Sequence, residues 1–141
     1  AGPEFTVGIL GNDPPYVLGV MQIEIRGTSP HEAIYSLEIK RDWEERVRYL
    51  CPPPISESLL KRIEEVALRA YRALECRDVS RVDIRVGEDG VPYFLEMNPL
   101  PGLSPFYGDL PIMARNMGWE YPRLIRTIFH HALKRYGFVE Q

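Results

Sequence analysis

The residues best suited to chemistry lie on two short segments that the sequence predicts as neighbouring strands. Arg81, Asp83 and Arg85 alternate with apolar residues on the first segment, and Glu96 and Asn98 alternate with apolar residues on the second. Side chains alternate between the two faces of a strand, so each group shares one face. Carboxylate and amide oxygens without a nearby histidine or cysteine favour a hard cation such as Mg²⁺. Arginines on the same face could hold phosphoryl oxygens and stabilise developing negative charge.

A β-hairpin is the element that must position these residues. Residues 87–90 end in Asp-Gly between two alternating runs, which is among the strongest hairpin signals. A two-residue turn there places Asp83 opposite Glu96, and a four-residue loop keeps the same faces. A three-residue loop swaps the faces, and the apolar pattern rejects it. The opposite face is then wholly apolar and expected in the core, through the pairs Val82–Met97, Ile84–Leu95 and Val86–Tyr93.

Directly opposed carboxylates repel each other and should destabilise a sheet. A bound cation, a shared proton or the flanking arginines could offset that repulsion. An exposed sheet face with mixed charges that cancel fits the same residues. The loop that follows, residues 98–105, contains three prolines and Gly102. A glycine there would let backbone N–H groups approach a ligand closely, which favours a ligand site.

The other predicted elements surround this hairpin. Short β-branched and aromatic runs predict strands, and the three-and-four spacing of apolar residues predicts helices. The polar residues 34–48 predict a long loop with some strand character. The predicted strands are 5–10, 16–20 and 22–26. The first predicted helix has Ser56 or Ser58 as its N-cap and ends near residue 74. Two further helices are predicted, a short one at 110–117 and a longer one at 122–137. The last helix is expected to bury Leu124, Ile125, Ile128, Phe129, Ala132, Leu133 and Tyr136.

Composition excludes several classes of protein. The chain has 141 residues, with 17 basic and 20 acidic side chains and a net charge of -3. Proteins that bind nucleic acid through its backbone usually carry a basic excess, so no nucleic-acid partner is expected. No apolar run is long enough to span a bilayer. The predicted class is α+β, an antiparallel sheet with helices packed on one face.

The cysteines and histidines offer weaker candidates. Cys51 and Cys76 are expected to be small buried hydrophobes and not a disulfide framework, which favours the reducing cytoplasm. His130 and His131 are adjacent on a predicted helix and therefore diverge by about 100°, so we expect helix surface and not a metal site.

The ordered motifs resemble a known family. Arg81-Val82-Asp83, then Glu96-Met97-Asn98, then Pro101-Gly102 resemble the C-terminal metal-binding segment of the ATP-grasp superfamily, and most closely that of D-alanine-D-alanine ligases. The resemblance implies that Asp83, Glu96 and Asn98 hold two Mg²⁺ ions, with Mn²⁺ as a substitute, that bridge the phosphates of ATP. It implies that Arg81 and the backbone at Gly102 stabilise an acyl-phosphate and a tetrahedral intermediate.

The resemblance extends over nearly the whole chain. Glu4, in the run Glu4–Val7, resembles the glutamate that binds the ATP ribose in this family, and Lys40 resembles the lysine of its mobile phosphate loop. The order of motifs implies that residues 1–141 form one C-terminal ATP-grasp subdomain. The glycine-rich phosphate loop and the adenine-contacting strand of the family have no counterpart here, and the first residue is Ala1, not Met. We therefore expect N-terminal and central domains elsewhere in a longer protein.

Two departures concern the acceptor substrate. In the ligases the loop lysine is followed by Tyr or Phe, whereas Arg41 follows Lys40 here. The ligases also place a serine shortly before the Leu-x-Pro of the last segment, where it binds the terminal carboxylate of the acceptor. The stretch Phe106–Asp109 has no serine. The resemblance therefore leaves the acceptor open, and whether the residues before Phe5 are native is also open.

The implied reaction is ATP-dependent amide formation through an acyl-phosphate, with small amino acids as substrates and a place in peptidoglycan biosynthesis. On its own the chain is expected to bind nucleotide weakly and to be inactive, and the full-length protein could be a homodimer. Two alternatives stay open: a non-catalytic ATP-grasp-like module for assembly or regulation, and a magnesium-dependent hydrolase built on the same carboxylate pair.

Overall fold

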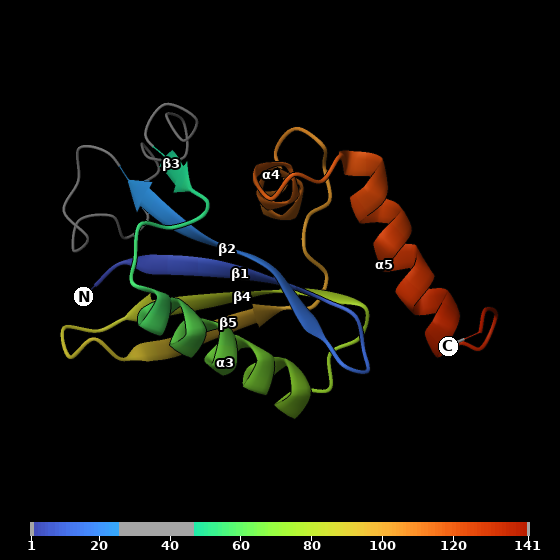
Figure 1. The fold of residues 1–141 in the computed structure, drawn as a ribbon, viewed down its shortest axis with the longest axis horizontal. Helices are drawn as coiled ribbons and strands as arrows, with labels where there is room; N and C mark the ends of the chain where they lie inside the picture. The colour runs from blue at the N-terminus through green and yellow to red at the C-terminus, as the bar shows by residue number, and fades with distance from the viewer. Residues whose placement is uncertain (1, 26–46, 141) are drawn as a thin grey trace.

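A five-stranded antiparallel sheet forms the centre of the molecule (Figure 1). The structure is a computed structural model, and it describes residues 2–25 and 47–140. The antiparallel α+β class predicted from the sequence is confirmed. The strands are β1 (Glu4–Leu10), β2 (Tyr16–Ile25), β3 (Val47–Leu50), β4 (Val79–Val86) and β5 (Pro92–Asn98), and the helices are α3 (Glu57–Ala73), α4 (Asp109–Asn116) and α5 (Tyr121–Arg135).

The strands lie in the order β3-β2-β1-β4-β5, so β1 is central and β5 is an edge strand. The uninterrupted apolar run 7–10 follows from this position, because both faces of β1 are covered. The sequence predicted separate strands at 16–20 and 22–26. They form one strand, β2, which has a bulge against β1 between Gly8 and Ile9. Most of the loop predicted at 34–48 lies outside the described residues.

Helix α3 covers one face of the sheet. Ser56 caps its N-terminus, because the Ser56 hydroxyl accepts a hydrogen bond of 3.1 Å from the backbone N–H of Leu59. Of the two N-caps that the sequence allowed, Ser56 is therefore the one that forms. Ile63, Ala67 and Tyr71 are buried, at the spacing of one helix face, and pack against apolar side chains of β1, β2 and β4. The charged opposite face is solvent-exposed, as predicted.

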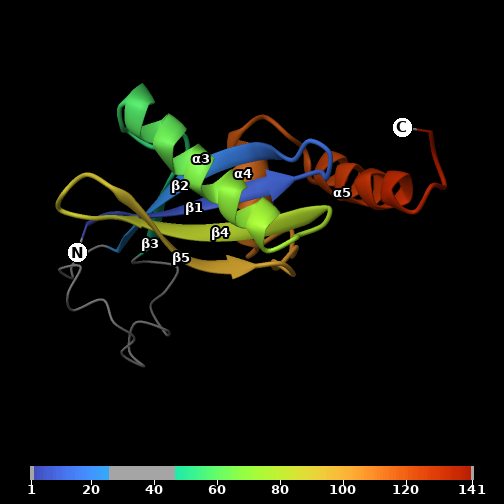
Figure 2. The same cartoon turned by 90° about the horizontal axis from the view of Figure 1, so that it is seen from below.

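Helix α4 lies on the other face of the sheet, where it packs with the first turns of α5 (Figures 1 and 2). The sequence predicted helices on one face only, so this detail is corrected. The close approach depends on Gly8 in β1, because a Cβ there would lie 2.6 Å from Leu110 and 2.8 Å from Met113 of α4. The buried apolar residues at this contact form a second core cluster, separate from the one under α3. Two layers of helices therefore sandwich the sheet.

The hairpin of β4 and β5 follows the predicted register only in the half that is far from its turn. Asp83 lies opposite Glu96, as predicted, but a bulge in β5 then shifts the pairing so that Ile84 lies opposite Phe94 and not Leu95. Beyond the bulge Val86 pairs with Pro92 in place of Tyr93. The prediction that Tyr93 and Leu95 belong to the core is wrong: both are about half exposed. An edge strand has one neighbour, so its side chains are covered from one side only.

Helix α5 buries much less than its apolar pattern predicts. Of the residues expected in the core, Leu124 is fully buried, whereas Phe129 and Tyr136 are 63% and 68% exposed. Figure 1 shows the reason: only the start of α5 meets α4, and the rest of the helix runs past the end of the sheet. Among the described residues, no helix is both long and apolar enough to cross a bilayer.

Candidate functional site

The charged side chains of β4 and β5 gather on the sheet face that carries α4. Glu4 and Thr6 of β1 join them, because Thr6 pairs with Asp83 across the β1–β4 ladder and Glu4 pairs with Arg85. The first residue of α4, Asp109, reaches the same cluster. Val82 and Ile84 point to the opposite face and are buried under α3. The alternation predicted for β4 therefore holds, and it delivers its charged residues to one place.

Asp83 is the most firmly held carboxylate of the cluster. Its Oδ1 accepts a hydrogen bond of 3.0 Å from the hydroxyl of Thr6, a residue that is fully buried. Arg81 donates from Nε to Oδ1 at 3.2 Å and from Nη2 to Oδ2 at 3.3 Å. A bidentate guanidinium and a hydroxyl donor together restrict the orientation of the carboxylate. Asp83 is thus oriented before any ligand arrives.

Glu96 faces Asp83 from the edge strand, and its side chain is 66% exposed. A hydrogen bond with Asp83 raises the pKa of the Glu96 carboxyl, the negative charge of Asp83 raises it further, and Arg81 opposes both effects. Arg81 lies 3.8 Å from Glu96, too far for a direct hydrogen bond. The repulsion expected from the sequence is therefore present, and the arginine offsets only part of it.

Arg81 bridges two segments of the chain. Its Nη1 donates to Oδ2 of Asp109 at 3.2 Å, while the other edge of the guanidinium holds Asp83. Burial is the main cause that raises the pKa of the Asp109 carboxyl, and the charge of Arg81 and a hydrogen bond with Tyr49 counter it. The predicted role of Arg81 beside a reacting centre requires a fixed guanidinium, and these contacts fix it.

Glu4 and Arg85 form a second ion pair at the far end of the same face. Arg85 Nη2 donates to Oε2 of Glu4 at 3.0 Å, and both side chains are more than a third exposed. Such a pair contributes on the order of 0–1 kcal/mol in water. The Glu4 carboxylate, predicted to bind a ribose, therefore remains accessible at the surface.

Asn98 and Gly102 lie at and after the end of β5. The Oδ1 of Asn98 accepts a hydrogen bond of 3.1 Å from the backbone N–H of Leu100, so this amide oxygen already has one partner. Gly102 is exposed, and a Cβ built on it would meet no atom within 4 Å. The structure places Arg81, Asp83, Glu96 and Asn98 together on the paired strands and leaves Gly102 on the adjoining loop. Lys40 lies outside the described residues.

The oxygen atoms available to a hard cation at this site come from two carboxylates and one side-chain amide. Within residues 2–25 and 47–140, no group of three His, Cys, Asp or Glu side chains is arranged to hold a metal ion. Asp83 and Glu96 supply two carboxylates, and Asn98 lies opposite Arg81 on the same ladder. Mg²⁺ is commonly held by one or two protein carboxylates, with water and phosphate as its other ligands. These residues therefore fit Mg²⁺ that arrives with a phosphate-bearing substrate.

Two residues of the cluster, Thr6 and Asp109, had no predicted role. Thr6 shares a face of β1 with Glu4, so strand alternation could have assigned it to the site. Asp109 is different, because it joins the cluster only through the packing of α4 on the sheet. The sequence placed Asp109 only at the start of a helix, in a stretch that lacks the serine of the ligases.

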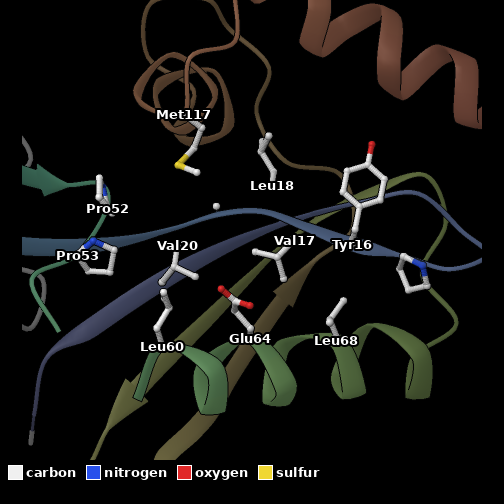
Figure 3. A pocket seen from close by; sticks show the side chains of 12 residues that line it. Tyr16, Val17, Leu18, Val20, Pro52, Pro53, Leu60, Glu64, Leu68 and Met117 are labelled. Carbon is white, nitrogen blue, oxygen red and sulfur yellow. The ribbon is translucent and has the colours of Figure 1, made fainter. Parts of the chain in front are cut away.

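A separate pocket of about 360 Å³ lies along the outer edge of β2 (Figure 3). Leu60, Glu64 and Leu68 of α3 line one side, and Met117 at the end of α4 lines the other. None of the charged residues described above lines it. Burial raises the pKa of Glu64, the one acidic side chain of the lining. The pocket is mostly apolar, and among the described residues no lysine, arginine or histidine lines it to hold a phosphate.

Comparison with known proteins assigns the family. The family described as "D-ala D-ala ligase C-terminus" matches residues 1–130. This chain belongs to the D-Ala-D-Ala ligase C-terminal family. A D-alanine--D-alanine ligase from Dechloromonas aromatica is 37% identical over 131 residues, covering 93% of this chain and 40% of the relative. One from Desulforudis audaxviator is 35% identical over 136 residues, covering 96% of this chain and 42% of the relative.

Solved structures of ligases share the fold. The D-alanine--D-alanine ligase from Bacillus anthracis complexed with ATP superposes with a TM-score of 0.73 at 26% identity, over 95% of this chain and 40% of that one. The VanG D-Ala:D-Ser ligase from Enterococcus faecalis gives a TM-score of 0.70 at 26% identity, over 93% and 36% of the two chains. The D-Ala-D-Ala ligase C-terminal domain described here thus spans about 40% of the length of the relatives it matches. The ATP-grasp resemblance predicted from the motifs is confirmed.

Proposed function

We propose that this domain supplies the metal and phosphate half of the active site of an ATP-dependent carboxylate–amine ligase. The observation that carries the proposal is the fixed pair Asp83 and Glu96, opposed across β4 and β5 with Arg81 beside both. The remaining domains would lie elsewhere in the same protein, because relatives of the family are more than twice as long. The domain alone would then be inactive, since the rest of the active site would come from those other domains.

In this proposal ATP phosphorylates a carboxylate, and an amine then attacks the acyl-phosphate. The amine nitrogen forms a C–N bond, the C–O bond to phosphate breaks, and phosphate leaves with the electron pair while the amine gives up a proton. Asp83, Glu96 and Asn98 would hold Mg²⁺, and Mn²⁺ could replace it. When bound, the metal would neutralise the phosphate oxygens and align donor and acceptor for in-line transfer.

The chain's own residues would orient the substrates. Arg81, fixed by Asp83 and Asp109, would stabilise the negative charge that develops on the oxygen of the acyl carbon, together with the backbone at Gly102. Glu4 would accept hydrogen bonds from the ribose hydroxyls, and Lys40 would lie over the phosphates. Thr6 would keep Asp83 oriented when the substrate arrives. Small amino acids would be the substrates, and a place in peptidoglycan synthesis follows from the family.

The cytoplasm is the compartment that fits this proposal. ATP is the phosphoryl donor, and the two thiols of this domain, Cys51 and Cys76, are both free in the structure. Thiols remain reduced in the cytoplasm and tend to pair in oxidising compartments. The full-length protein could act as a homodimer.

Phosphate release by the full-length protein tests the proposal. With ATP and Mg²⁺, we expect phosphate release only when a small amino acid, which supplies both the carboxylate and the amine, is present. Asp83→Asn and Glu96→Gln should each lower the rate at least about tenfold, because each removes a charged ligand. Glu65→Gln, on the exposed face of α3, is the matched control and should leave the rate unchanged.

Two results would contradict the ligase proposal. Equal phosphate release with and without the amino acid would indicate a magnesium-dependent hydrolase. Wild-type rates in both the Asp83→Asn and Glu96→Gln proteins would show that the carboxylate pair has no part in the chemistry, as expected of a non-catalytic module.

A further inference from the structure

Glu4 and Arg85 form one end of the sheet face that carries the candidate site. The two residues lie directly opposite each other on β1 and β4, and Arg85 Nη2 donates to Oε2 of Glu4 at 3.0 Å. Directly opposed residues of neighbouring strands share a face, with their Cβ atoms about 5 Å apart. The strand ladder therefore fixes the spacing of this pair, and the hydrogen bond engages one of the two oxygens of the Glu4 carboxylate.

The inner part of the Arg85 side chain is enclosed by the protein. Its Nε is buried, and among the described residues this nitrogen has no hydrogen-bond partner. The side chain as a whole is 36% exposed, and its Nη2 reaches Glu4. Close packing around an inner segment limits the rotamers that a side chain can adopt. Arg85 is therefore suited to hold the Glu4 carboxylate in one orientation.

The site residues of β4 follow one another in the order Arg81, Asp83 and Arg85, in steps of two residues, or about 7 Å. In the proposed function Arg81 serves the acyl group and Asp83 the metal and phosphates. Arg85 is then one step further from the reacting carbon, where the ribose follows the phosphates of ATP. A hydrogen bond with Asp83 is the largest cause that raises the pKa of Glu96, and the charge of Glu4 is a smaller one. Glu4 thus lies close enough to the carboxylate pair to influence it.

We propose that Arg85 is a positioning residue for the nucleotide: it holds the Glu4 carboxylate in the orientation that accepts hydrogen bonds from the ribose hydroxyls. Arg85 acts through Glu4 and does not contact the reacting atoms. This role rests on the proposed function, in which Glu4 binds the ribose. Recognition of the ribose then depends on an arginine of β4 as well as on the glutamate of β1.

Nucleotides with and without ribose hydroxyls test this role of Arg85. Isothermal titration calorimetry of the full-length protein with Mg²⁺ measures the Kd of ADP and of 2′,3′-dideoxyADP, without any need for turnover. Both ligands carry the same base and phosphates, so the ratio of their Kd values isolates recognition of the hydroxyls. We expect the wild type to bind ADP about tenfold more tightly, which corresponds to roughly 1.4 kcal/mol, as hydrogen bonds to a charged group allow.

Variants at position 85 show whether Arg85 sets this ratio. Arg85→Met keeps an apolar stem, and it should lower the ratio to about threefold or less because Glu4 is no longer preorganised. Arg85→Lys keeps a charged donor and should retain most of the wild-type ratio. Arg69→Met is the matched control, since Arg69 is exposed on α3, and it should leave the ratio unchanged. Arg85→Gln serves in place of the methionine variant if that protein does not fold.

Two results would overturn the role of Arg85 and leave the ligase proposal standing. Glu4→Ala should abolish the preference for ADP, and if it does so while Arg85→Met keeps the wild-type ratio, Arg85 does not position Glu4. If Arg85→Met weakens binding of both nucleotides equally, Arg85 attracts the phosphates or serves the fold, and the positioning role fails as well.

Failure of the underlying assignments gives different results. A wild type that binds ADP and 2′,3′-dideoxyADP equally would overturn the ribose role of Glu4 and the role of Arg85 together, whereas amino-acid-dependent phosphate release would still support the ligase proposal. A full-length protein that binds neither ADP nor ATP in the presence of Mg²⁺ would contradict the ligase proposal itself.

Discussion

Thr6 shows how one buried side chain serves the candidate site. It lies on the central strand, is fully buried, and its hydroxyl donates a 3.0 Å hydrogen bond to Asp83. Burial of a hydroxyl without a partner is unfavourable, so this bond stabilises the fold as well as orienting the carboxylate. The stability and the proposed chemistry of the domain are therefore linked at this residue.

Thr6→Val keeps the shape of the side chain and removes the donor. We expect the variant to lose about 1 kcal/mol of unfolding free energy, the usual contribution of one hydrogen bond, with somewhat more if Asp83 is left short of a partner. Urea denaturation measures it. Thr127→Val is the control, because the Thr127 hydroxyl bonds to Arg123 on the exposed surface of α5. Equal losses in the two variants would contradict a special role for Thr6.

For individual residues, the sequence correctly predicted the contacts that follow from strand alternation. The pairing of Asp83 with Glu96 was found because side chains on a strand repeat every two residues, and the Asp-Gly turn set the register. The contact between Arg81 and Asp109 was not found, since it depends on how α4 packs on the sheet. No periodicity in the sequence encodes a contact between such distant segments.

Helix α3 depends on its N-terminal cap. The Ser56 hydroxyl accepts a hydrogen bond from the N–H of Leu59, one of the first-turn groups that have no partner within a helix. Ser56→Ala should lower the unfolding free energy by about 1 kcal/mol. Ser58→Ala, two residues further and exposed, should change it by less than about 0.5 kcal/mol. Thermal or urea unfolding distinguishes them, and a larger loss in Ser58→Ala would contradict the cap assignment.

Helix α5 is attached near its C-terminal end by an ion pair. Arg135 Nη2 donates to Oδ2 of Asp78 at 2.7 Å and its Nε donates to Oδ1 at 3.1 Å, while Asn12 donates to Oδ1 at 2.9 Å. The hydrogen bond from Arg135 is the largest cause that lowers the pKa of the Asp78 carboxyl. These contacts hold the exposed end of the helix against the β1–β2 turn.

The lowered pKa of Asp78 gives a pH dependence of known sign. A carboxyl whose pKa is lower in the folded state contributes stability above its unfolded pKa of about 3.9, and this is lost as pH falls through the folded value. Asp78→Asn should therefore reduce stability at pH 7, and its difference from wild type should shrink as the pH falls below about 4. Asp13→Asn is the control. A difference that stays constant down to pH 2.5 would contradict this ion pair.

At the element scale the sequence predicted helices and strands well and their ends less well. The three-and-four spacing of α3 and α5 and the alternation of β4 are repeated many times, so they outweigh local exceptions. The bulge in β5 is a single extra residue, and it moved Tyr93 and Leu95 out of their predicted core positions. Likewise, the apolar stripe of α5 does not show that the helix runs past the sheet. Tertiary placement, not helix propensity, decides that exposure.

At the scale of the whole molecule, helices lie on both faces of the sheet (Figure 2). Helix α3 covers an apolar face, whereas the other face carries an apolar cluster under α4 beside the charged residues of β1, β4 and β5. Among these charged residues the Glu96 side chain is 66% exposed. Of the motifs that indicated this family, those with Glu4, Arg81 and Glu96 lie on strands of the same sheet. Composition alone indicated a slightly acidic domain, and it could not show where in the structure the charged side chains lie.

Binding of Mn²⁺ to the full-length protein tests the central claim most directly. Electron paramagnetic resonance measures free and bound Mn²⁺ in the presence of a non-hydrolysable ATP analogue, without any need for turnover. We expect the wild type to bind Mn²⁺, and Asp83→Asn and Glu96→Gln each to weaken binding at least about tenfold. Glu65→Gln should bind as the wild type does. Equal Mn²⁺ affinity in the wild type and in both carboxylate variants would contradict the claim that Asp83 and Glu96 hold the metal.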